Sequence, residues 1–523
     1  MKRIVFLLLF ILTGVGALNA QQSSDTSQPV TIIRSDNLYW KKLDANTELQ
    51  ILSGNVQLKQ GNTLFTCDSC IVNDAANIFE AFGRVHINDS DTADVYSDYL
   101  RYYTNTRMAY LSGNVRLSDG HATLNTPDME YDVANKIGTY KNGGRVVNKK
   151  SILTSREGIY YTDLKDIYFK HNVELKDPSY YLKSDSLIYN TENQIARFIA
   201  ETYIKDSSGR VIRTREGYYD VANSHAEFFS RTVVEDGTMV ASSDRMASDD
   251  SSGIMQMEGR AVVRDTAKGQ TILADRIFID RKNDRFLATV KPLMIIKQDE
   301  DSLYVTADTL FSARLTELYK NDSAMLAMLN LKEKDSTNRY FEAYRNVRVF
   351  SDSMQAVSDS LFYSFKDSTF HLFYDPVVWS KKSQITGDTI YLYTKNKKAE
   401  QVRVLENSFI VDEVEPGIYH QIKSSFINGF FKDGTLDSVR ATGLAESVYF
   451  LQDDDSAFTS VNQTRSDAID IYFLNGELYK VVFRSELKGT LYPISHKHPS
   501  EMRLQGFRWL DNRRPKTKYE MFE

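Results

Sequence analysis

The 523-residue sequence has only two cysteines and, after its first twenty residues, no stretch of 18 apolar residues. Two cysteines form at most one disulfide, which is too few to stabilise a chain of this length and excludes a disulfide-scaffold protein. The lack of a long apolar run argues against a downstream membrane-spanning helix. Lys and Arg together number 64, against 70 Asp and Glu, and no long basic block precedes the C-terminal tail. This balance argues against nucleic acid as a partner, because phosphate binding needs concentrated positive charge.

The first twenty residues have the pattern of a secretion signal. Lys2 and Arg3 form a basic start, Ile4–Leu12 is apolar, and residues 17–20 end in a small residue, Ala20. We predict a signal peptide over residues 1–20, cleaved near Ala20. The alternative is an uncleaved N-terminal anchor, for which the apolar run is short. No cysteine follows the run, which excludes a lipoprotein anchor, so we expect an exported soluble chain.

Two short patterns recur about every thirty residues along the chain. The first is Gly-x-Val-x-aliphatic and is clearest at Gly54, Gly83 and Gly113. The second is a small residue, an acid and then an alternating apolar segment, as at Asp98 and Asp185. With 42% hydrophobic residues the chain is able to bury a core. The repeat predicts a stack of similar units rather than several unrelated domains.

Apolar and polar residues alternate inside each unit. Val115 and Leu117 are predicted to point one way and Arg116 the other, which is typical of a strand with one dry face. Since one unit cannot bury its dry face alone, we predict an all-β fold. It is an elongated repetitive β-jelly-roll or solenoid of ~30-residue units with an apolar interior groove. The residues predicted to line this interior are Val56, Leu58, Val85, Ile87, Val115, Leu117, Val173 and Leu175.

Two segments of the chain do not follow the ~30-residue repeat. We assign residues 21–310 to the repeats, 311–345 to an insertion, 346–485 to further degenerate repeats and 486–523 to a polar and basic C-terminal tail. Within the insertion, a short helix capped by Asp322 is predicted. The basic and aromatic residues of the tail suit an anionic headgroup, a partner protein or a flexible solubilising role.

The residues able to carry chemistry are few. Cys67 and Cys70 form a CxxC on a predicted strand, where alternation places them on opposite faces, a poor geometry for a disulfide or a shared metal. His496 and His498 are the only closely spaced histidines and lie in the polar tail. The recurring acids are expected to bond the backbone of the turn that precedes a strand. No nucleophile, phosphate-binding or dinucleotide motif is found, so we predict no enzyme, no catalytic residue, no metal site and no cofactor.

The interleaved patterns (Ala/Ser)-Asp-x-apolar-x-Tyr and Gly-(Asn/Arg)-Val-x-apolar resemble the OstA-like (organic-solvent-tolerance, LptA) family. The resemblance is closest from Asp36 to Val263 and more diffuse to Ser485. It implies a β-jelly-roll open at both ends that carries lipopolysaccharide from the inner to the outer membrane, with acyl chains in the interior groove. It also implies a periplasmic location, with a further association with the outer membrane. The chain departs from the family by its length, since a usual bridge protomer has far fewer repeats.

A dry interior suits such a lipid physically. Each CH₂ exposed to water costs about 0.8 kcal/mol, so several acyl chains need a continuous apolar surface. From the sequence alone, an open groove and a closed core are indistinguishable. We expect lipopolysaccharide as ligand, end-to-end β-augmentation with inner-membrane and outer-membrane transport components, and self-association. The alternatives are a structural or adhesive cell-envelope β-solenoid without ligand and a polysaccharide-processing enzyme.

Overall fold

The computed structural model describes residues 29–44, 47–89, 92–297, 302–332, 335–395, 398–432, 435–453, 455–474 and 477–522. They divide into two compact units. The first comprises the described residues up to Gly144 with Tyr160–Asp163, and the second comprises Arg145–Ile159 with the described residues from Leu164 onward. The predicted signal peptide, residues 1–20, lies outside the described residues.

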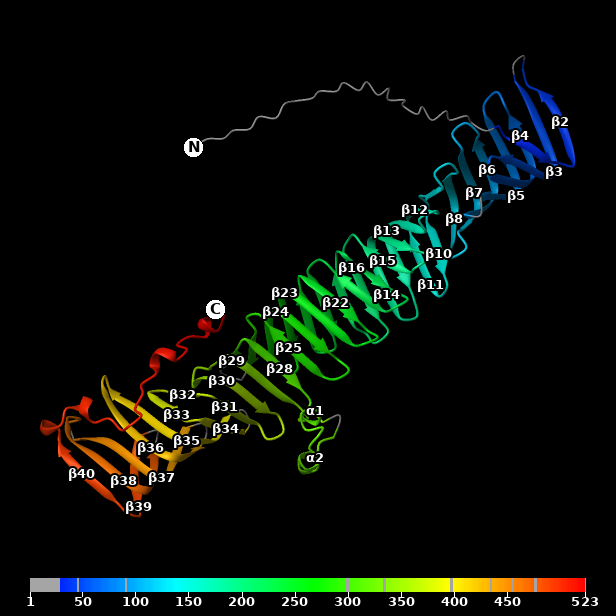
Figure 1. Ribbon diagram of the computed structural model, residues 1–523. Helices are drawn as coiled ribbons and strands as arrows, with labels where there is room; N and C mark the ends of the chain where they lie inside the picture. Colours follow the sequence, from blue (N-terminus) through cyan, green and yellow to red (C-terminus); the bar gives the residue numbers. More distant parts are fainter. Residues whose placement is uncertain are drawn as a thin grey trace, which may run out of the picture. The chain divides into compact units, whose positions relative to one another are not determined.

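In the first unit, strands that follow one another in the chain pair antiparallel from β3 onward (Figure 1). Two short strands begin the unit, and both pair with β3, β1 along its second half and β2 along its first. The strands are β1 (Thr31–Arg34), β2 (Asn37–Lys42), β3 (Glu48–Gln60), β4 (Thr63–Asn73), β5 (Ile78–Asp89), β6 (Ala93–Tyr103), β7 (Met108–Ser118), β8 (Thr123–Asp132) and β9 (Ile137–Tyr140).

The second unit is also built of antiparallel strands, in which runs of short strands separate the long ones, and β10 and β12 have residues in both units. The long strand β14, for example, pairs with β15 along one half and with β16 along the other. The strands from β10 to β28 are β10 (Gly144–Asn148), β11 (Ser151–Ser155), β12 (Glu157–Tyr161), β13 (Asp166–Lys176), β14 (Tyr180–Asn190), β15 (Ile195–Phe198), β16 (Thr202–Asp206), β17 (Val211–Thr214), β18 (Gly217–Asp220), β19 (His225–Phe228), β20 (Thr232–Asp236), β21 (Met239–Ser243), β22 (Arg245–Asp249), β23 (Ile254–Asp265), β24 (Gln270–Asp280), β25 (Arg285–Thr289), β26 (Leu293–Lys297), β27 (Ser302–Thr306) and β28 (Thr309–Ala313).

Two short helices follow, α1 (Leu315–Leu318) and α2 (Ser323–Leu329). The predicted cap of α2 is confirmed: the Asp322 carboxylate accepts a hydrogen bond from the Met325 N–H at 2.9 Å. The remaining strands are β29 (Tyr340–Phe350), β30 (Gln355–Ser364), β31 (Thr369–Phe373), β32 (Val377–Ser380), β33 (Ser383–Thr386), β34 (Thr389–Lys395), β35 (Lys398–Glu415), β36 (Ile418–Lys432), β37 (Thr435–Gln452), β38 (Phe458–Leu474), β39 (Glu477–Arg484) and β40 (Lys488–Pro493). The predicted all-β class is confirmed.

The long strands of the first unit bend near their middle. The pairing register shifts between Ser112 and Val115 in β7, and the neighbouring strands shift at the matching level. At this point Gly113 has φ +77° and Asn114 has φ +49°. Glycine adopts a positive φ without a steric penalty and asparagine at low cost. The recurring Gly-Asn and Gly-Arg pairs of the sequence are therefore bulges that turn each strand through a corner.

The bend divides the first unit into two walls. The first wall consists of residues 48–53, 69–73, 78–82, 99–103, 108–112 and 128–132. The second wall consists of residues 56–60, 63–67, 85–89, 93–97, 115–118 and 123–126. The walls face each other, because Phe65 of the second wall lies against Phe79 and Tyr102 of the first, with ring centroids 5.2 and 4.7 Å apart. The core of this unit lies between them.

The C-terminal segment packs back onto the second unit. Met502 and Leu504 are buried in one cluster with six residues of β35–β38. Farther along, Met521 is buried against Leu293 and Phe350. The short 3₁₀ turns of the C-terminal segment are η1 (Ile494–His496), η2 (Pro499–Glu501), η3 (Asp511–Arg513) and η4 (Lys518–Phe522). Two of its arginines, Arg508 and Arg513, pair with Asp375 at 2.9 and 2.6 Å.

Candidate functional site

The eight predicted interior residues all lie inside the fold. None is more than 1% exposed: Val56, Leu58, Val85, Ile87, Val115, Leu117, Val173 and Leu175. Six of them belong to the second wall of the first unit, and Val173 and Leu175 follow the corresponding bend of β13 in the second unit. Their burial places them in an apolar interior, and their role in contacting a ligand stays a prediction.

Sequence reasoning missed the opposite wall of the interior. Phe79, Leu100, Tyr102 and Tyr131 belong to the first wall and are fully buried. Three of these four side chains are aromatic and carry more apolar area than a valine, since aromatic side chains bury roughly 150–250 Å² each. The signal for them was present in the apolar positions that follow each recurring acid, such as Leu100 and Tyr102 after Asp98.

In each wall the strands end on the side away from the bend. The strand ends of the two walls meet along a line that we call the seam. In the first unit, Tyr102 donates from its hydroxyl to the Gln60 side-chain oxygen at 2.5 Å. Gln60 in turn donates to the Thr104 carbonyl at 2.8 Å. One repeat later, the Tyr131 hydroxyl donates to the Asp89 carboxylate at 2.8 Å. The seam of the first unit is thus closed by buried polar contacts between its walls.

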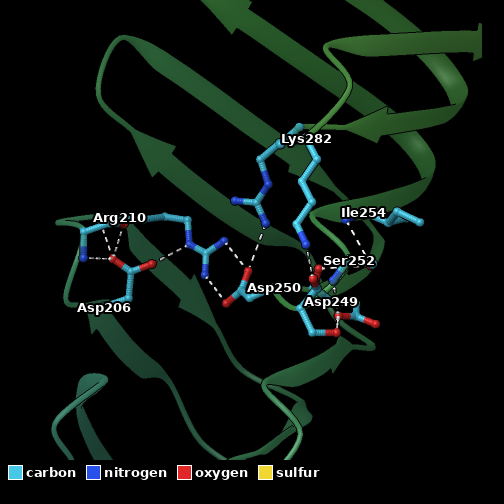
Figure 2. Close-up of polar contacts among 10 residues, drawn as sticks. Asp206, Arg210, Asp249, Asp250, Ser252, Ile254 and Lys282 are labelled. Atoms are coloured by element: carbon cyan, nitrogen blue, oxygen red, sulfur yellow. Dashed lines mark hydrogen bonds and ion pairs between the residues drawn. The ribbon is translucent and has the colours of Figure 1, made fainter.

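At one place in the second unit, charged residues close the seam (Figure 2). Arg210 precedes β17 and donates two hydrogen bonds to Asp250, at 2.8 and 2.6 Å, from across the seam. Asp206 lies 2.9 Å from the same guanidinium, and Arg281 donates to Asp250 at 2.9 Å. Burial disfavours the Asp250 carboxylate, but hydrogen bonds and positive charge from the two arginines outweigh burial and lower its pKa.

Two surface hollows are lined mainly by polar residues. The first, of about 370 Å³, lies at this seam beside Arg210, Asp250 and Lys282. The second, of about 540 Å³, lies between β37, β38 and β40 beside Glu446 and Arg465. Neither hollow is lined by any of the eight interior candidates. The two walls of the first unit contact each other across the interior, where the Phe65 ring packs against Phe79 and Tyr102.

The recurring acids have a structural role, but not where the sequence placed it. Asp98 lies within β6, at the bend, and not in a turn ahead of the strand. Its carboxylate accepts a hydrogen bond from the Asn114 side chain at 2.7 Å. The same contact joins Asp68 to Arg84 at 2.6 Å in the preceding repeat. In these two repeats the acid thus ties the corner of its own strand to the corner of the next strand.

The prediction that Cys67 and Cys70 point to opposite faces is wrong. Both side chains are buried, at 7% and 0% exposure, and the two thiols share a hydrogen bond. The bend falls between them, because the register of β4 against β5 shifts between Thr66 and Ser69. At the corner, Cys67 and Asp68 of β4 lie opposite three residues of β5, Gly83–Val85, so strict alternation fails there.

No metal centre is found among the described residues, where no group of three His, Cys, Asp or Glu side chains converges. Of the two tail histidines, His498 uses its ring Nδ1 in a contact with the Ser500 hydroxyl at 2.7 Å. The described residues also contain no helix that is both long and apolar enough to cross a bilayer.

Comparison with known proteins identifies the repeat. Residues 27–185 match the model of the OstA-like protein family, and residues 153–285 match the model described as LptA/(LptD N-terminal domain) LPS transport protein. Over residues 27–285 the chain is thus similar to OstA-like and LptA-type proteins. The resemblance inferred from the Gly-x-Val and Ala/Ser-Asp patterns is confirmed.

One solved structure to which the chain is similar is the crystal structure of LptH from Pseudomonas aeruginosa, titled the LptA homologous periplasmic component of the conserved lipopolysaccharide transport device. It shares 17% identity, and the match covers 22% of this chain and 83% of that chain. The TM-score of this match is 0.19. No curated protein matches the sequence.

Proposed function

We propose that the chain is an exported periplasmic protein that carries lipopolysaccharide from the inner to the outer membrane and holds its acyl chains in the apolar interior. The observation that carries this proposal is an interior enclosed by two apolar walls, in a chain with a lipopolysaccharide-transport family match over residues 153–285. Val56, Leu58, Val85, Ile87, Val115, Leu117, Val173 and Leu175 are the proposed contacts with the acyl chains. This role needs no catalytic residue and no cofactor.

The energetics favour an enclosed route. Exposing an acyl chain of about a dozen carbons to water costs roughly 10 kcal/mol of free energy. For several chains the cost is tens of kcal/mol. Because the walls of the first unit are in contact, a bound chain must separate them and replace wall-to-wall packing with acyl packing. The seam bonds at Gln60 and Asp89 are the contacts that this separation strains.

Both ends of the chain offer strands for docking. In the first unit, β1 and β2 are exposed along their whole length, and Ile33, Tyr39 and Trp40 are more than half exposed. In the second unit, Tyr479 of β39 and Leu491 of β40 are similarly exposed. We propose that these edges add to the sheets of membrane-bound transport components, or to a second copy of this chain, by β-augmentation.

A lipid assay tests the carrier role. The full chain, purified from the cell envelope without detergent, should contain lipid A-type acyl chains detectable by mass spectrometry. After delipidation it should rebind lipopolysaccharide, and the deacylated saccharide should not compete. Competition by the saccharide alone would contradict an acyl-chain site.

The close packing of the walls favours a second candidate, a structural or adhesive β-solenoid of the cell envelope without ligand. A chain that carries no lipid and does not rebind it would support this alternative.

Docking is tested separately. Photoreactive residues at Trp40 and Leu491 should crosslink to envelope proteins or to a second copy of the chain in cells. The matched control is Arg116, which is exposed on the outer face of β7. Equal crosslinking from all three positions would refute docking through the end strands.

A further inference from the structure

The bend of β4 brings two thiols together in the interior. Cys67 pairs across the sheet with Val56 of the second wall, and Cys70 pairs with Leu52 of the first. In a regular strand, residues three apart lie about 10 Å apart and point to opposite faces. Here both thiols are buried and hydrogen-bonded to each other. A disulfide requires this kind of approach, with both side chains pointing toward a shared space.

We propose that Cys67 and Cys70 form an intrachain disulfide across the bend of β4 once the chain reaches an oxidising compartment. The proposal rests on the export proposed above, because thiols persist in the cytosol and are oxidised outside it. The disulfide would fix the angle of the bend at the beginning of the first unit, where the two walls diverge.

The two thiols differ in reactivity. The hydrogen bond from Cys70 lowers the pKa of the Cys67 thiol. The same bond and burial raise the pKa of Cys70. Cys67 is also the more exposed of the two, so it is the nucleophile that meets an external oxidant.

The reaction is a thiol–disulfide exchange with an oxidant that itself carries a disulfide, such as oxidised glutathione or an oxidoreductase. The Cys67 thiolate attacks one sulfur of the oxidant, forms a mixed disulfide and releases the first thiol. Cys70 then loses its proton and attacks the Cys67 sulfur, which releases the second thiol. The two protein thiols are oxidised and the oxidant disulfide is reduced to two thiols.

The first experiment does not depend on export. The purified full chain is equilibrated in reduced and oxidised glutathione, quenched with acid, alkylated and weighed by mass spectrometry, once folded and once in urea. Because the fold holds the thiols together, the equilibrium constant for the disulfide should be higher in the folded chain by about tenfold, or ~30 mV. An equal or lower constant in the folded chain would overturn the proposal. Cys67→Ser and Cys70→Ser are the controls, and neither should form an intrachain disulfide.

The second experiment uses cells. The chain is trapped with acid, unfolded, alkylated and weighed, which gives its thiol count whether or not a variant folds. A processed, exported chain should have no free thiol until it is reduced, and two free thiols on it would overturn the proposed modification. An unprocessed chain would instead contradict the export in the proposed function, and the comparison of folded and unfolded chain would then decide the disulfide.

Discussion

Removing one hydroxyl at the seam should loosen the first unit without disturbing its shape. Tyr131 is fully buried, and its hydroxyl donates to Asp89, which is 2% exposed and also accepts from Thr63 at 3.1 Å. Tyr131→Phe keeps the ring but leaves a buried carboxylate with one fewer donor. A hydrogen bond to a charged group contributes about 1.5–3 kcal/mol, so we expect a loss of this size in the free energy of unfolding.

The loss is measured by urea titration with hydrogen exchange of peptides from β4 to β8. With an m-value of ~2 kcal/mol per molar urea, the midpoint for these strands should fall by about 1 M. The matched control is Tyr110→Phe, which changes an exposed tyrosine on the outer face of β7 and should shift the free energy by less than ~0.5 kcal/mol. If both variants behave alike, the seam bond does not hold the walls together, and the closure argument is wrong.

Three further predictions concern the bend, the charged seam and the tail. Gly113→Ala should lower the free energy of unfolding by at least ~1 kcal/mol more than Gly120→Ala. Both positions have a positive φ, but only at Gly113 would the new Cβ lie 2.7 Å from a carboxylate oxygen. Equal losses in the two variants would contradict the corner contact. The pKa of Asp250 is lowered, so its stabilisation is present above its unfolded pKa of about 4 and is lost as pH falls through the folded pKa. The stability gap between wild type and Asp250→Asn, measured by urea unfolding, should therefore narrow from neutral pH toward pH ~2, and a constant gap would refute the assignment. Met502→Ala should lower the free energy of unfolding by about 2–5 kcal/mol, whereas Met328→Ala on exposed α2 should change it little. Equal urea midpoints for the two variants would mean that the C-terminal segment does not pack as described.

Much of this fold could be predicted from the sequence because its signals are local. Alternation of Val115 and Leu117 with Arg116 indicates which face is dry, and the structure buries both apolar residues. Asp322 caps a helix through a contact three residues away, which a sequence pattern captures. The recurring glycines at a fixed spacing indicated a regular event in each unit, which the structure identifies as the bend.

What the sequence did not predict depends on that bend. Strict alternation assumes a straight strand, so Cys67 and Cys70 were placed on opposite faces, although the bend turns both inward. The seam partners Gln60 and Tyr102 are 42 residues apart, and only the folding of one wall over the other brings them together. The packing of Met521 against Phe350 likewise depends on the path of the tail, which no local pattern encodes.

The most direct test of the carrier account is photo-crosslinking to lipopolysaccharide in cells. Photoreactive residues at Val85, Val115 and Val173 point into the interior, and one at Arg116 points outward. The account predicts lipopolysaccharide adducts from the three interior positions and few from Arg116. Adducts from Arg116 alone, with none from the interior, would show that the lipid does not travel between the walls.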